Sequence, residues 1–184
     1  MSRSADGSVG EVDTARVWRL LARGGLVGPQ PEATSSEAGR PGSVALAKYN
    51  GLADPAGTEQ LGRWLAERVQ PFSPSLVLLW EDPEDIALGH VVARELGVRA
   101  VRGYNAEGLV ELADPLPRGS RVLVLADAFR DAGLVRAMRA IVEQHGGTVA
   151  AIAVLVDTDV LATAGAPATP VVSLVSLPGR AALE

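Results

Sequence analysis

Short apolar runs alternate with amphipathic stretches through the second half of the chain. The apolar runs predict buried strands at 75–80, 99–102, 121–126, 149–156 and 171–177. Between them, apolar residues at helical spacing predict helices at 84–96 and 134–145. Apolar strands that alternate with amphipathic helices are typical of a parallel sheet covered on both faces. The pattern therefore predicts an α/β fold with about five parallel strands and helices on both faces.

The first part of the chain is less regular. Residues 1–13 are polar and small, which predicts a disordered N-terminus ahead of a single domain over 14–184. Thr14 is a candidate cap for a helix that ends at Gly24 and Gly25. Residues 28–43 are rich in Pro, Ser and Gly and predict a long loop or a small irregular hood. A strand at 44–49 and a helix opened by Asp54-Pro55 follow.

Composition excludes several classes of protein. No apolar run approaches the roughly 18 residues of a membrane span, so we expect no membrane partner. The net charge of −5 and the lack of a basic stripe argue against nucleic-acid binding. The chain has no cysteine and its first residues show no apolar signal region, which fits a cytoplasmic protein.

The stretch from Arg121 to Asp157 is the most informative part of the chain. It predicts a strand that ends at Asp127, a Gly-containing turn, a helix and a second strand. Such turns lie at the carboxyl ends of parallel strands, where α/β proteins bind ligands. The stretch resembles the phosphoribosyl-pyrophosphate motif of type I phosphoribosyltransferases, in which two acidic residues and a Thr/Gly-rich loop follow the strand. Here Ala126 stands in place of the first acidic residue.

The resemblance extends over roughly residues 14–178 and is closest to orotate phosphoribosyltransferase. It is carried by the order LLARGGLV, GRPGSVALAKYNGLADP, a helix, PSLVLLWEDPEDIALGHVVARELGV and the Asp127 motif. The resemblance implies a parallel-sheet fold with a small hood, a homodimer, and a nucleotide or phosphoribosyl metabolite as ligand. It implies Mg²⁺ as cofactor only if the protein is catalytically active.

The family's 5′-phosphate loop corresponds to Arg130, Asp131, Ala132, Gly133 and Leu134, so these residues are candidates for ligand binding. Backbone amides at a helix N-terminus bind phosphate, but Asp131 brings a negative charge to that position. Arg130 offsets that charge if it turns inward; alternatively, it pairs with Asp131. Asp131 has a second interpretation as the cap of the helix that follows.

The family's pyrophosphate loop corresponds to the acidic segment 81–85, with Glu84 and Asp85 as candidate ligand-binding residues. Four carboxylates there repel pyrophosphate unless a metal ion intervenes. One interpretation is an acidic first helical turn, with Asp82 as cap and Pro83 at the first helical position. The other is a magnesium-binding cluster, although no spacing identifies one and we assign no metal ligand.

Two residues are candidates for catalysis. Asp127 matches the family's ribose-binding acid, although a turn-forming Asp is an equal interpretation. Arg102 matches the arginine of the family's mobile loop, but the catalytic lysine of that loop is missing, since Lys48 is the chain's only lysine.

Three functional hypotheses follow. The first is an orotate phosphoribosyltransferase-like protein with degenerate loops, weak or non-catalytic, that binds a nucleotide, another metabolite or a protein. The second is an active enzyme that transfers phosphoribose to orotate with Mg²⁺. The third keeps the fold but binds a cationic or uncharged metabolite. The first is favoured because the phosphate loop, the pyrophosphate loop and the mobile loop all depart from the family pattern.

Overall fold

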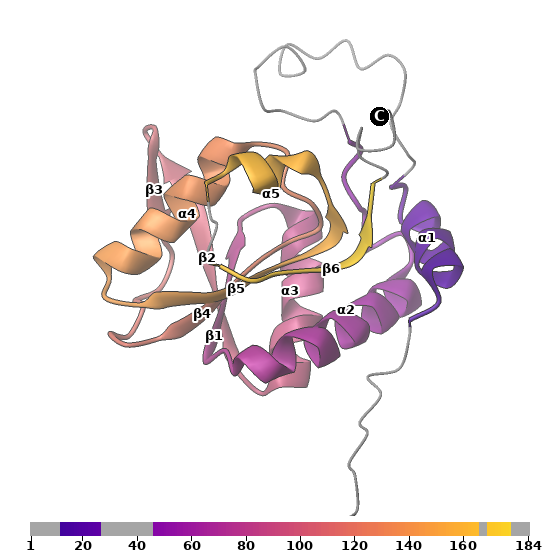
Figure 1. Cartoon of the computed structure of the whole chain (residues 1–184), viewed down its shortest axis with the longest axis horizontal. Helices are drawn as coiled ribbons and strands as arrows, with labels where there is room; N and C mark the ends of the chain where they lie inside the picture. Colours follow the sequence, from indigo (N-terminus) through magenta and orange to yellow (C-terminus); the bar gives the residue numbers. More distant parts are fainter. Residues whose placement is uncertain (1–11, 27–45, 166–168, 178–184) are drawn as a thin grey trace, which may run out of the picture.

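Six strands form one sheet in the computed structural model, which describes residues 12–26, 46–165 and 169–177 (Figure 1). The strands are β1 (Leu76–Trp80), β2 (Arg99–Ala106), β3 (Leu109–Leu112), β4 (Arg121–Ala126), β5 (Thr148–Asp157) and β6 (Val171–Ser176). The helices are α1 (Thr14–Arg23), α2 (Pro55–Val69), α3 (Pro83–Leu96), α4 (Ala132–Gln144) and α5 (Asp159–Thr163), with a 3-10 turn at Gln70–Phe72. The predicted α/β fold with a largely parallel sheet is confirmed.

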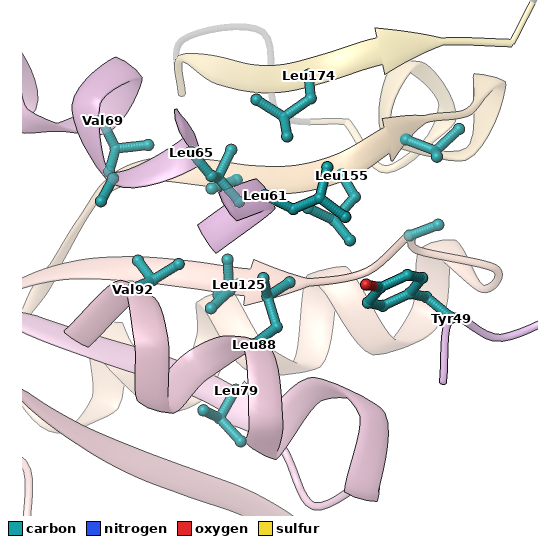
Figure 2. Close-up of a cluster of buried hydrophobic side chains, with 14 of the residues drawn as sticks. Tyr49, Leu61, Leu65, Val69, Leu79, Leu88, Val92, Leu125, Leu155 and Leu174 are labelled. Atoms are coloured by element: carbon teal, nitrogen blue, oxygen red, sulfur yellow. The ribbon is translucent and has the colours of Figure 1, made fainter. Parts of the chain in front are cut away.

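Each face of the sheet is covered by its own apolar cluster. Because successive strand residues point to opposite faces, β4 contributes to both clusters. Leu123 and Leu125 pack in the cluster formed with α1, α2 and α3, part of which Figure 2 shows. Val122 and Val124 pack in the cluster formed with α4 and α5. The near-continuous apolar sequence of the central strands follows from this burial on both faces.

The strand order places a topological switch point between β1 and β4. The sheet runs β3-β2-β1-β4-β5-β6, and only β3 is antiparallel to its neighbour. From β1 the chain continues to β2 on one side, whereas β4 lies on the other side and leads outward to β5 and β6. Ligands of open α/β sheets bind outside the carboxyl ends of the strands at such a point. Two loops meet there, namely residues 81–82 after β1 and residues 127–131 after β4.

Several local predictions need correction. Residues 46–49 form no strand, because their carbonyl and amide groups bond to the side chains of Arg130 and Asp127 instead of to a neighbouring strand. Asp13, not Thr14, caps α1, since its carboxylate accepts a hydrogen bond from the amide of Ala15. The short elements β3 and α5 were not predicted. The proposed hood at 28–43 and the N-terminal residues 1–11 lie outside the described residues.

Within the described residues, no helix has the length and apolar character needed to cross a membrane.

Candidate functional site

Asp127 follows β4 directly and is almost completely buried, with 3% of its surface exposed. Its carboxylate accepts four hydrogen bonds. The amides of Ala128 (2.6 Å) and Tyr49 (2.8 Å) donate to Oδ1 and Oδ2, and Arg130 donates to each oxygen at 2.8 Å. A carboxylate has about four acceptor positions, so these contacts use the full capacity of the group.

Arg130 is equally committed to the chain's own groups. Besides its two bonds to Asp127, its guanidinium donates to the carbonyl oxygens of Leu46, Ala47 and Ala128, each at 2.8 Å. These five bonds account for all five N–H groups of a guanidinium. The earlier alternative, in which Arg130 pairs with Asp131, is wrong, because its ion pair is with Asp127.

Asp85, in the first turn of α3, is a second buried carboxyl at the site, with 5% of its surface exposed. Its Oδ1 accepts a hydrogen bond of 2.8 Å from the backbone amide of Asp127. Burial, followed by the negative charge of Asp127, raises the pKa of Asp85 to about 8, although the hydrogen bond from that amide opposes the shift. Asp85, which was predicted to bind a ligand, is therefore buried against the β4–α4 loop.

Lys48 lies beside the β1–α3 loop, a position that the sequence did not indicate. Its Nζ donates to Oδ2 of Asp82 at 2.7 Å. Burial lowers the pKa of Lys48, but the hydrogen bond and the charge of Asp82 outweigh this effect and raise it overall. Asp82 precedes α3 as predicted, yet its side chain makes no capping hydrogen bond to the helix among the described residues.

The predicted phosphate loop forms the N-terminus of α4. Asp131 is exposed, and its Oδ1 accepts a hydrogen bond of 2.7 Å from the amide of Gly133, which confirms the capping interpretation. Ala132 is buried, whereas Gly133 and Leu134 are half-buried. The N-terminal amides of a helix attract anions, and here the chain's own carboxylate takes up one of these donors.

Among the described residues, the remaining candidates form no hydrogen bond with Asp85, Asp127 or Arg130. Arg102 is exposed on β2, where its register partner is Leu79 of β1. Glu84 is half-buried in the first turn of α3, where the helix dipole stabilises a negative charge. In residues 12–26, 46–165 and 169–177, no group of three or more His, Asp or Glu side chains is arranged to hold a metal ion.

The structure thus joins Asp85, Asp127 and Arg130 with the 46–49 segment, which sequence reasoning did not connect to them. Tyr49 is the clearest example. Its amide bonds Asp127, its ring is completely buried, and its hydroxyl lies 2.9 Å from Oγ1 of Thr58. Figure 2 shows this ring just beyond the end of the strand that carries Leu125. In the sequence, the only sign of this arrangement was that residues 46–49 lie within GRPGSVALAKYNGLADP, one of the stretches that carry the family resemblance.

The curated sequences that resemble the chain are phosphoribosyltransferases. The chain is 36% identical over 108 residues to the orotate phosphoribosyltransferase of Pelotomaculum thermopropionicum, covering 58% of this chain and 56% of that protein. It is 43% identical over 54 residues to the adenine phosphoribosyltransferase of Rubrobacter xylanophilus, which is 29% of each. The chain therefore matches little more than half of the first relative and less than a third of the second. No protein-family model matches the chain.

Solved structures share the whole architecture at low sequence identity. The adenine phosphoribosyltransferase of Rhodothermus marinus superposes with a TM-score of 0.68 at 20% identity, over 90% of this chain and all of that one. The Mycobacterium tuberculosis orotate phosphoribosyltransferase in complex with 5-phospho-α-D-ribosyl 1-diphosphate gives 0.62 at 18% identity, over 89% and 88% of the two chains. Identities this low show the fold alone. The chain therefore has the fold of the type I phosphoribosyltransferases, and part of its sequence is similar to orotate and adenine phosphoribosyltransferases.

Proposed function

We propose that this chain is a phosphoribosyltransferase-like protein with little or no transferase activity, which keeps the fold in order to bind a nucleotide or related metabolite or to contact another protein. One observation carries the proposal. Asp127 and Arg130, the acidic and basic groups of the β4–α4 loop, satisfy each other and the neighbouring backbone completely. A ligand gains contacts with either group only after these bonds break.

The charges around the site also oppose the transfer of phosphoribose from phosphoribosyl pyrophosphate. Release of pyrophosphate from phosphoribosyl pyrophosphate develops negative charge, which an enzyme stabilises with positive groups already in place. Lys48 and Arg130 lie beside the two loops, and each is paired with an aspartate. Arg102, the predicted catalytic arginine, is exposed on β2, and Asp131 adds negative charge at the N-terminus of α4.

An active transferase is the second candidate function, and two observations favour it. The sequence match to an orotate phosphoribosyltransferase is 36% identical, and Lys48 lies beside the loop that corresponds to the pyrophosphate loop. In that case Mg²⁺ enters with the substrate, because this ion is commonly held by one or two carboxylates together with substrate phosphates. Glu81, Asp82 and Glu84 are exposed or partly exposed carboxylates at that loop.

The deciding experiment measures turnover and binding separately. Phosphoribosyl pyrophosphate and Mg²⁺ are supplied with orotate or with adenine, and nucleotide formation is followed by chromatography. We expect no measurable product and weak calorimetric binding of phosphoribosyl pyrophosphate. Turnover of about 1 per second, an ordinary enzymatic rate, contradicts the proposal. Titration with orotidine and adenosine monophosphates then tests nucleotide binding directly, and failure of both leaves a protein partner as the remaining role.

A further inference from the structure

Residues 46–49, which we call the strap, connect the two loops at the β1/β4 switch point. On the β4 side, Arg130 donates to the carbonyls of Leu46 and Ala47, and the amide of Tyr49 donates to Asp127. On the β1 side, Lys48 pairs with Asp82. The strap therefore reaches across the boundary where ligands of open α/β sheets bind.

The strap depends on side chains for its position. Within the described part of the chain, the hydrogen bonds of residues 46–48 are those with Arg130 and Asp82. Backbone–backbone bonding resumes only at Asn50, whose amide donates to the carbonyl of Gly24 at 2.6 Å. Of the contacts in the described residues, removal of the guanidinium thus leaves those of Lys48, Tyr49 and Asn50.

We propose that Arg130 latches the strap over this edge of the sheet, so that the chain's own groups hold the phosphoribosyltransferase-like site closed. The inference rests on the proposed function, because it concerns the same site, and it adds the contact that keeps the site inactive. Opening takes the Leu46 and Ala47 carbonyls away from Arg130 and the Tyr49 amide away from Asp127, and buried polar groups without partners are costly. A ligand that opens the latch must therefore supply a donor, such as a hydroxyl group, to Asp127 and acceptor oxygens, such as those of a phosphate, to Arg130.

The test replaces the guanidinium but keeps its charge. Arg130→Lys neutralises Asp127 but cannot make two parallel bonds to it while also holding both strap carbonyls. Arg121→Lys is the matched control, because Arg121 also donates to two backbone carbonyls, those of Phe72 and Ser73, at the opposite end of the sheet.

Two measurements are made on the full chain. Hydrogen exchange of a peptide spanning residues 46–50 reports strap opening, and we expect roughly tenfold faster exchange in Arg130→Lys than in the wild type or the control. Calorimetric titration with ribose 5-phosphate reports closure, and we expect at least several-fold tighter binding in Arg130→Lys. Unchanged exchange overturns the latch. Faster exchange without a gain in affinity overturns the claim that the latch keeps the site closed.

If the lysine variant does not fold, exchange of residues 46–50 is compared between the wild type and the double variant Asp127→Asn/Arg130→Gln, which removes both charges and leaves neither unpaired. Turnover of orotate or adenine by the wild type contradicts the proposed function, whereas the exchange and affinity measurements test the latch. The two failures are therefore distinguishable.

Discussion

Arg130 and Asp127 form a bidentate ion pair in which Nη1 lies 2.8 Å from Oδ1 and Nη2 lies 2.8 Å from Oδ2. The two residues are three positions apart in the loop after β4, and the carboxylate is almost fully buried. Paired charged hydrogen bonds of this kind are among the strongest in proteins, and their planar geometry fixes both side chains. The loop is thus held in one conformation by its own opposite charges.

Asp127→Asn should destabilise the protein strongly. The substitution leaves the Arg130 guanidinium partly buried without its counter-charge and replaces one acceptor oxygen by a donor. Removing one partner of a buried ion pair costs about 3–5 kcal/mol, and we expect a loss of this order in the free energy of unfolding measured with urea. Asp114→Asn, at an exposed position, is the control and should change that free energy by less than about 0.5 kcal/mol. Equal effects of the two variants would contradict the assignment of Asp127 as the buried ion-pair partner of Arg130.

The protein should become less stable as the pH rises from about 4 to about 8. The pKa of Asp85 is raised from 3.8 to about 8 in the folded protein, so the folded state holds this proton more tightly than the unfolded state does. The stabilisation is fully present below the ordinary value and is lost as the pH rises through about 8. We expect Asp85→Asn to remove most of this dependence when urea unfolding is compared at pH 5 and pH 8. The same slope in both proteins would show that another group is responsible.

Asp131→Thr should strengthen phosphate binding at the N-terminus of α4. Threonine is also a good helix cap, so the capping bond to Gly133 is retained while the negative charge is removed. Two unit charges about 4 Å apart in water repel by ~1 kcal/mol, which corresponds to roughly fivefold in affinity for inorganic phosphate by titration. Asp13→Thr makes the same change at the cap of α1, away from the site, and should leave the affinity unaltered. No gain at position 131 counts against phosphate binding at this terminus.

Gly24→Ala should lower the melting temperature. A Cβ atom at this position would lie 1.9 Å from Cε2 of Tyr49, so the buried ring must move. Overpacking of this kind costs about 1–3 kcal/mol. Gly103→Ala is the comparison, because its new Cβ would meet the ring of Trp80 at 3.5 Å, an ordinary contact. A larger loss at Gly103 than at Gly24 would refute the expected close packing.

We also expect the protein to form a homodimer, as the resemblance to orotate phosphoribosyltransferases implies. Sedimentation velocity at micromolar concentration should show a dimeric species. A single monomeric boundary over that range would exclude this assembly.

The central strands and the helices between them were predictable because burial on both faces leaves a strong signal in the sequence. For example, 121–126 was predicted as a strand and is β4, and Asp131 was recognised as a possible cap because caps depend on residues nearby in the chain. The hairpin partner β3 was missed, since its burial alternates weakly and it has only four residues. Short edge strands give little periodicity to detect.

The arrangement of the site was not predictable for a different reason. The hydrogen bond between Asp85 and Asp127 joins residues 42 positions apart, and the pairing of Lys48 with Asp82 spans 34. Local patterns carry no information on such contacts. Residues 44–49 were predicted as a strand, whereas the structure satisfies backbone groups of residues 46–49 through the side chains of Arg130 and Asp127.

The hydrogen bond between Tyr49 and Asp127 also has a consequence for folding kinetics. The bond joins residues 78 positions apart, and forming a contact so distant in sequence costs a large amount of chain entropy. The bond should therefore be absent from the folding transition state and should form after the sheet has assembled. Variants that break it are expected to accelerate unfolding while leaving the folding rate nearly unchanged, which makes Asp127 a determinant of the lifetime of the native state.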